Sequence, residues 1–140
     1  LLLDGIQDPG NLGTIIRTAD WFGFKQVICS NDTVDAYNPK VVQASMGSLA
    51  RMDIIYTNLE VLIRNSSLPT FAATLGGTSI FETSFGHEGL LILGNEGNGI
   101  RPEILEKVSN QVTIPQFGAA ESLNVAVSAG IFCAEVRRKA

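Results

Sequence analysis

Hydrophobic positions along the chain form short apolar runs that alternate with segments of helical periodicity. Six of the runs have the length and composition of β-strands. They lie at residues 1–6, 25–30, 53–57, 70–75, 90–94 and 111–115. The run at 90–94, LLILG, has no polar side chain, whereas a strand with one face in water alternates apolar and polar residues. We therefore predict an α/β fold, in which helices cover both faces of a mostly parallel six-stranded sheet.

The segments between these runs carry the start and stop signals of helices. We expect helices at residues 12–23, 38–47, 58–66, 100–108 and 122–138. The first should follow a turn at 8–11, DPGN, and end at Gly23. Asn38, Asn58 and Ser122 are of the residue types that cap helix N-termini, and each stands where one of the other helices should begin.

The last of these helices lacks a polar face over most of its length. Residues 123–134 are apolar or small except for Asn124 and Ser128. A helix on the surface of a monomer shows a polar side, so this helix should be buried on nearly all sides. We favour a homodimer in which a partner subunit covers it; a central helix of a monomer is the alternative. Asn124 would then be a buried amide that needs hydrogen-bond partners.

Composition limits the classes of function. The chain has 140 residues, 45% hydrophobic and 17% charged, which fits one folded domain. Its net charge of −4 argues against a general nucleic-acid binder, but not against a nucleic-acid enzyme whose main binding surface lies elsewhere. No stretch is long enough to span a membrane. Cys29, Cys133 and the single His87 form no metal or redox motif, so we expect buried thiols, a surface histidine, no metal and a reducing cytoplasm.

A glycine-rich turn, GNEGNG at 94–99, follows the fifth strand. It matches neither the dinucleotide fingerprint nor the P-loop, and the carboxylate of Glu96 would repel a phosphate. The turn instead suits a ligand approached by the backbone and bearing neutral or cationic polar groups; a plain turn is the alternative. Asn11 lies at the start of the first helix, and Arg17 faces away from its apolar stripe, toward a site above the strand ends.

Three segments together resemble the SpoU-type (TrmH-like) ribose 2′-O-methyltransferases of the SPOUT superfamily. They are DPGNLGTIIRTADWFG at 8–23, LILGNEGNGI at 91–100 and IPQFGAAESLNVAVSAG at 114–130. Their order and spacing agree with the family across the chain. The resemblance implies methyl transfer from S-adenosylmethionine to a ribose 2′-hydroxyl of RNA, ribosomal RNA more than tRNA. It also implies a C-terminal deep trefoil knot and a homodimer. Residues 1–140 would be the catalytic domain of a longer protein with an N-terminal RNA-binding domain.

The resemblance also assigns residues to roles. The catalytic positions match Asn11, Arg17, Glu96, Ser122 and Asn124. The cofactor pocket matches Thr74, Leu75, Gly76, Leu93, Gly94, Asn95, Gly97, Ile114, Pro115 and Leu123. RNA contacts are expected from Arg17, Lys40, Arg51 and Arg101, while Gln43 stands where many relatives have a basic residue. Since a guanidinium keeps its proton, we expect Arg17 to bind the neighbouring phosphate and stabilise the forming alkoxide, and the proton to pass to that phosphate or to water.

Two questions stay open at this point. Glu96 either complements the positive sulfonium or organises its loop by accepting backbone N–H groups. The competing functions are a Rossmann-type oxidoreductase domain, which the missing fingerprint disfavours, and a catalytically silent RNA- or nucleotide-binding α/β module.

Overall fold

A six-stranded sheet runs through the centre of the computed structural model, which describes residues 1–140. Its strands are β1 (Leu2–Asp4), β2 (Gln26–Ser30), β3 (Asp53–Thr57), β4 (Thr70–Ser79), β5 (Leu90–Gly94) and β6 (Asn110–Thr113). The order across the sheet is β3-β2-β1-β5-β4-β6, and every pairing between these strands is parallel. The predicted parallel α/β sheet is therefore confirmed.

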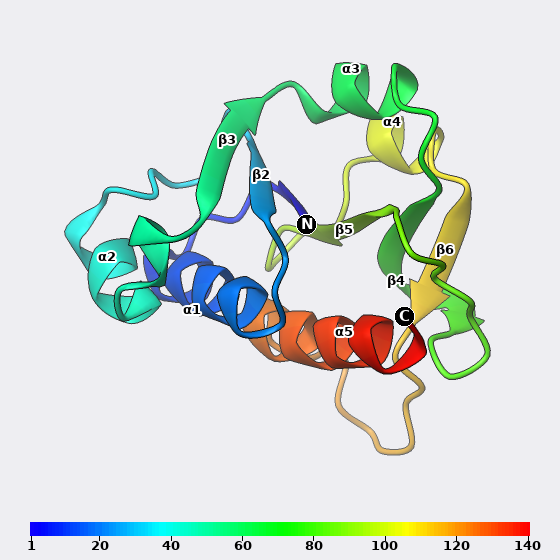
Figure 1. Ribbon diagram of the computed structural model, residues 1–140. Coiled ribbons are helices and arrows are strands. Elements are labelled where there is room, and N and C mark those ends of the chain that lie inside the picture. The colour runs from blue at the N-terminus through cyan, green and yellow to red at the C-terminus, as the bar shows by residue number, and fades with distance from the viewer.

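Helices cover both faces of the sheet (Figure 1). They are α1 (Pro9–Trp21), α2 (Pro39–Ser45), α3 (Leu59–Arg64), α4 (Pro102–Leu105) and α5 (Val125–Lys139), with a 3₁₀ turn, η1, at Ser48–Ala50. Helices α1, α2 and α5 lie on one side, where they share a core of 22 buried residues, and α3 and α4 enclose a smaller core of 8 on the other. None of these helices combines the length and the apolar character that a membrane crossing requires.

The segment 8–11 is the first turn of α1 rather than a turn that precedes it. The carboxylate of Asp8 accepts a hydrogen bond from the backbone N–H of Asn11, and Pro9 occupies the first helical position. Asp followed by Pro is a signal for a tight turn and for a capped helix start alike, because Pro fixes the same backbone angle in both. At the other end Gly23 has φ +69°, as the predicted terminating glycine requires.

Strand β4 continues to Ser79, although the sequence predicts its end at 75. The pairing with β6 is irregular there, because Ala73 and Thr78 both lie opposite Val112. The residues between them, 74–77, form an excursion from the strand. Gly77 is required in it, since a Cβ atom would lie 2.4 Å from the backbone of Gln111. Other predicted elements are shorter than expected: β1 covers only Leu2–Asp4, β6 ends at Thr113 and α4 covers only Pro102–Leu105.

Helix α5 begins three residues later than predicted, and its N-cap is Asn124 rather than Ser122. The Asn124 side chain accepts hydrogen bonds from the N–H groups of Ala126 and Val127, and it is exposed rather than buried. In the single chain α5 has an exposed side, where Val127 is 52% exposed, so the alternative of a helix buried at the centre of a monomer is wrong, and burial by a partner subunit stays a prediction.

The last turn of α5 is fastened to the rest of the fold by basic side chains. Arg137 donates hydrogen bonds to the carbonyl oxygens of Phe22 and Gly23, which are left free where α1 ends. The ammonium group of Lys139 donates to three carbonyl oxygens of the turn that follows β4, those of Ile80, Phe81 and Thr83. These contacts fix the far end of α5 and leave its N-terminus beside the first turn of α1.

Candidate active site

The three motif segments meet at the carboxyl-terminal edge of the sheet. Since all six strands are parallel, the loops after β1, β5 and β6 leave the same edge, which is where α/β proteins place ligands. Strands β1 and β5 are neighbours, with Asp4 paired to Gly94 in register. The loop 5–8 therefore lies directly beside the glycine-rich turn 94–99.

Glu96 joins these two loops. Its carboxylate accepts hydrogen bonds from the backbone N–H groups of Gln7 (3.2 Å) and Asp8 (3.0 Å) and from the side-chain amide of Asn11 (3.4 Å). Free N–H groups at the start of a helix carry partial positive charge, which favours a carboxylate at this place. Of the two roles left open for Glu96, the organising role is therefore realised, although the backbone that it holds belongs to the loop after β1.

Asn124 brings the third segment to the same point. Its side-chain nitrogen donates to the side-chain oxygen of Asn11 over 3.0 Å, while its own oxygen caps α5. Asn11 thus stands between Glu96 and Asn124, residues that lie 85 and 113 positions away in the sequence. Three of the five predicted catalytic residues form one connected polar cluster.

The other two predicted catalytic residues lie outside this cluster. Arg17 is exposed on α1, six residues beyond Asn11, which is a rise of about 9 Å along the helix. Its guanidinium forms no ion pair, so its charge is free to meet an anion. Ser122 is exposed in the loop before α5, and no protein group is hydrogen-bonded to its hydroxyl.

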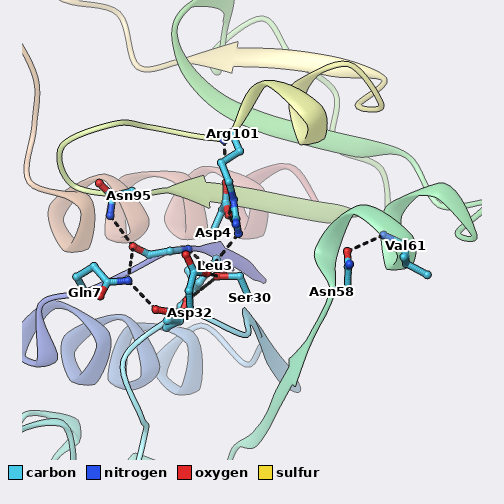
Figure 2. Close-up of polar contacts among 11 residues, drawn as sticks. Leu3, Asp4, Gln7, Ser30, Asp32, Asn58, Val61, Asn95 and Arg101 are labelled. Atoms are coloured by element: carbon cyan, nitrogen blue, oxygen red, sulfur yellow. Dashed lines mark hydrogen bonds and ion pairs between the residues drawn. The ribbon is translucent and has the colours of Figure 1, made fainter.

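Asn95 holds the glycine-rich turn in shape and joins it to the loop after β1, and Figure 2 shows its side chain directed toward that loop. The Asn95 side chain accepts hydrogen bonds from the N–H groups of Gly97 and Asn98 and donates one of 2.6 Å to the carbonyl of Gly5. Gly94 packs so tightly against the far end of the turn that a Cβ atom would lie 2.3 Å from Gly99. We call residues 4–11, 94–101 and Asn124 the paired region of the site.

The remaining predicted cofactor residues surround a more open area. We call residues 74–77 and 115–123 the open region. The Thr74 hydroxyl is buried without a hydrogen-bond partner, and Leu75 is 78% exposed. No backbone group between 115 and 123 takes part in a backbone–backbone hydrogen bond. Leu123 is half exposed at the end of this stretch, whereas Leu93 is buried in the core beneath it.

The open region fits S-adenosylmethionine. Exposed Leu side chains offer apolar contact to a planar base, and the unpaired Thr74 hydroxyl and free backbone groups offer hydrogen bonds to a nucleoside. The nearby carboxylate of Glu96 disfavours a phosphate-bearing cofactor but is compatible with a sulfonium cation. Apolar surface with a few convergent polar groups is the usual composition of a nucleoside pocket.

The four predicted RNA-binding residues divide into two pairs. Arg17 and Lys40 are exposed and form no ion pair. Arg51 pairs with Asp20 over 2.7 Å, and Arg101 is bound to Asp4 and Asp32. The hydrogen bond with Asp4 raises the pKa of Arg101. The acidic partners were missed from the sequence; the one signal for Asp4 was a charged residue within the apolar run LLLDGI.

The cysteines and the histidine take no part in the site. Cys29 and Cys133 are buried, and burial raises the pKa of the two thiols to about 12 and about 11. Both are therefore unreactive, as predicted. His87 is exposed in the loop before β5. No group of three or more His, Cys, Asp or Glu side chains is arranged to hold a metal ion.

The fold and the site define an α/β domain with a polar cluster and an exposed, largely unpaired region at the carboxyl edge of its sheet. The SpoU rRNA Methylase family matches residues 1–134. The chain belongs to this family. It is 38% identical over 141 residues to the 23S rRNA (guanosine(2553)-2'-O)-methyltransferase RlmP of Bacillus subtilis, covering 98% of the chain and 57% of that protein.

Solved structures give the same result. A structure described as a putative RNA methyltransferase of the TrmH family from Porphyromonas gingivalis superposes with a TM-score of 0.93 at 44% identity, over 99% of this chain and 59% of that one. The SpoU methyltransferase AviRb from Streptomyces viridochromogenes, in complex with AdoMet, superposes with a TM-score of 0.90 at 30% identity, over 99% and 58% of the chains. The chain thus spans somewhat more than half the length of these proteins.

Proposed function

We propose that the chain is the catalytic domain of an RNA ribose 2′-O-methyltransferase that uses S-adenosylmethionine and acts on ribosomal RNA. The observation that carries this proposal is the Asn11–Glu96–Asn124 cluster, which stands at the same edge of the sheet as the unpartnered hydroxyl of Thr74. Membership of the SpoU rRNA Methylase family supports the reaction, and the B. subtilis relative, a 23S rRNA methyltransferase, supports the substrate class.

S-Adenosylmethionine supplies, when bound, an electrophilic methyl group for attack by a ribose 2′-oxygen. Residues 74–76, 93–94, 114–115 and 123 would hold the cofactor, with Leu75 and Leu123 against the base and backbone groups around the ribose. Glu96 and Asn95 would keep the glycine-rich turn in place next to the cofactor, because their side chains already bind the loop after β1.

Arg17 would act on the RNA. Its free guanidinium can hold the phosphate next to the target ribose and stabilise the negative charge that develops on the 2′-oxygen. The proton would leave to that phosphate or to water, because a guanidinium with a pKa above about 12 does not accept it. Lys40, the other predicted RNA residue without an acidic partner, would bind the RNA backbone farther from the reacting atoms.

We further propose a homodimer and a knotted C-terminal segment, both of which follow from the family resemblance. The half-exposed Val127 on α5 and the exposed Trp21 on α1 support the dimer, because apolar side chains on packed neighbouring helices are typical of a buried interface. A dimer would also place Arg17 near a second chain. Free, buried thiols are compatible with a reducing cytoplasm as the site of action.

Calorimetric titration with S-adenosylhomocysteine, with NAD⁺ as the control, tests the cofactor proposal. Micromolar binding of S-adenosylhomocysteine alone, about −8 kcal/mol, is the expected result. Binding of NAD⁺ instead would contradict the assignment and favour an oxidoreductase. If neither compound binds, a catalytically silent module replaces the enzyme.

A further inference from the structure

We infer that Arg101 is a positioning residue of the active site, and that its ion pair with Asp4 holds Glu96 in place. The inference rests on the proposed methyl transfer for its activity readout, but the contacts are independent of it. The side chain of Asp4 lies at the end of β1 and is only 1% exposed. A buried carboxylate without a partner is strongly unfavourable, so whatever pairs with Asp4 is fixed in turn.

Arg101 supplies every hydrogen bond that this carboxylate receives. Its backbone N–H donates to one oxygen of Asp4 over 2.8 Å, and its Nε and Nη2 groups donate to the other. The same Nη2 group reaches Asp32 at 3.3 Å, and the Ser30 hydroxyl donates to that oxygen of Asp32. Figure 2 shows Arg101 directly over Asp4, with Ser30 and Asp32 beside them. The ends of β1 and β2 are thus both bound to a single residue, Arg101, which follows the glycine-rich turn.

The turn that carries Glu96 is consequently attached at both ends. Asn95 binds the carbonyl of Gly5 at one end, and Arg101 binds Asp4 at the other. Between them the turn closes on itself through two hydrogen bonds between the backbones of Asn95 and Gly99. Only a turn held in this way keeps the Glu96 carboxylate at the N–H groups of Gln7 and Asp8. Arg101 therefore acts through Glu96, and the Nε and Nη2 groups of its guanidinium are already engaged by the carboxylates of Asp4 and Asp32.

The substitution Arg101→Lys distinguishes a role in positioning Glu96 from a role in binding RNA. Lysine keeps the positive charge that an RNA contact needs, but it lacks the two guanidinium N–H groups that bind the carboxylate of Asp4 together. We expect kcat to fall by about 10²-fold, as for a misplaced catalytic group, with little change in KM for RNA. Arg64→Gln, which removes an exposed charge without a partner on α3, is the matched control and should leave both unchanged.

A second readout needs no activity. Amide hydrogen exchange of Gln7 and Asp8, followed by NMR, should become faster in Arg101→Lys and stay unchanged in Arg64→Gln. Arg101→Gln would leave the buried carboxylate of Asp4 without a charged partner, so a single variant can fold poorly. The double variant Asp4→Asn/Arg101→Gln removes both charges, and its amide exchange at Gln7 and Asp8 should be faster in the same way. Unchanged exchange at Gln7 and Asp8 in a folded variant would overturn the inference. Faster exchange in a chain that transfers no methyl group would uphold it and overturn the proposed function instead.

The dependence of RNA binding on salt gives an independent check. A lost phosphate contact lowers the slope of log affinity against log salt concentration by about one. Lys40→Gln should show this change, whereas the double variant Asp4→Asn/Arg101→Gln should not. A reduced slope in the double variant would return Arg101 to the RNA surface and contradict its assignment as a positioning residue.

Discussion

The two regions of the site differ in how many of their polar groups are paired within the chain. In the paired region, Glu96, Asn95, Asn11 and Asn124 each bind a group on a distant segment. In the open region the Thr74 hydroxyl has no partner, and residues 115–123 form no backbone–backbone hydrogen bonds. The groups that must not move relative to one another are fixed by the fold, and the groups left free are those that a ligand can satisfy.

Removing the carboxylate from the paired region should have the largest effect on catalysis. In Glu96→Gln one carboxylate oxygen is replaced by an NH2 group, so the N–H groups of Gln7 and Asp8 and the amide of Asn11 share a single uncharged acceptor oxygen. We expect kcat to fall by about 10²-fold in steady-state methyl-transfer assays. Glu88→Gln, an exposed glutamate without an ion pair, is the control. Normal turnover in Glu96→Gln would show that the pairing has no catalytic use.

A glycine-to-alanine substitution should lower the stability of the fold in the paired region and leave it unchanged in the open region. In Gly94→Ala the new Cβ atom meets the backbone of Gly99 and Ile100, so unfolding in urea should show a loss of about 1–3 kcal/mol. In Gly76→Ala no atom lies within 4 Å of the new Cβ, and stability should stay within about 0.5 kcal/mol. Gly76→Ala should instead weaken binding of S-adenosylhomocysteine. Equal destabilisation by both substitutions would remove the distinction between the regions.

Shortening an exposed apolar side chain of the open region should weaken cofactor binding without lowering the stability of the fold. Leu123→Ala removes contact area that is half exposed in the free chain. The loss of this contact should raise the Kd of S-adenosylhomocysteine roughly tenfold, by the usual value of buried methylene groups, with the Tm unchanged. Leu68→Ala, at another partly exposed leucine before β4, should change neither quantity. A lower Tm without a change in Kd would place Leu123 in the packing of the loop.

The two functions of Asn124 should separate in one variant. Asn124→Asp keeps an oxygen that caps α5 but replaces the N–H donor to Asn11 by a carboxylate. Stability should therefore change little, whereas Asn124→Ala should lose about 1 kcal/mol with the cap. Both variants should lose activity, because both lose the bond to Asn11. Full activity in Asn124→Asp would mean that this bond is dispensable.

The thiols give the smallest expected effect. Since burial raises the pKa of Cys29 to about 12 and of Cys133 to about 11, both stay protonated in the folded chain at pH 8. Iodoacetamide should label neither thiol until the chain is unfolded, as mass spectrometry can show. Rapid labelling of the native chain at pH 8 would contradict the burial of Cys29 in β2 and of Cys133 in α5.

Local signals in the sequence predict most of the fold. The bounds of β3 and β5 match the prediction, and Asn38 and Asn58 cap α2 and α3 as expected. The errors arise where one sequence signal fits two local structures, or where contact with a distant segment determines the local structure. Asp8–Pro9 fits both a turn and a helix start, and Ser122 and Asn124 both suit an N-cap. The excursion at 74–77 depends on the register with β6, which no local pattern encodes.

The site was predictable as a set of residue types, but its connections were not. Nothing near Arg101 in the sequence indicates that its partner is Asp4, 97 residues earlier, so the arginine was assigned to the RNA by its charge alone. Accepting N–H groups of its own loop was one of the two roles left open for Glu96, and the N–H groups of another loop, which it binds, were not foreseeable from its own turn. Contacts across a parallel sheet depend on strand order, which periodicity does not give.

The position of the methyl group on the RNA can be determined by alkaline hydrolysis. Ribosomal RNA is incubated with the chain and S-adenosylmethionine carrying a labelled methyl group, and the labelled RNA is then treated with alkali. A methyl group on a ribose 2′-oxygen blocks cleavage at its own phosphodiester, so the account predicts label in alkali-resistant dinucleotides, and about 10²-fold slower labelling with Glu96→Gln. Label recovered in mononucleotides would place the methyl group on a base and contradict the account, as would RNA without label from a chain that binds S-adenosylhomocysteine.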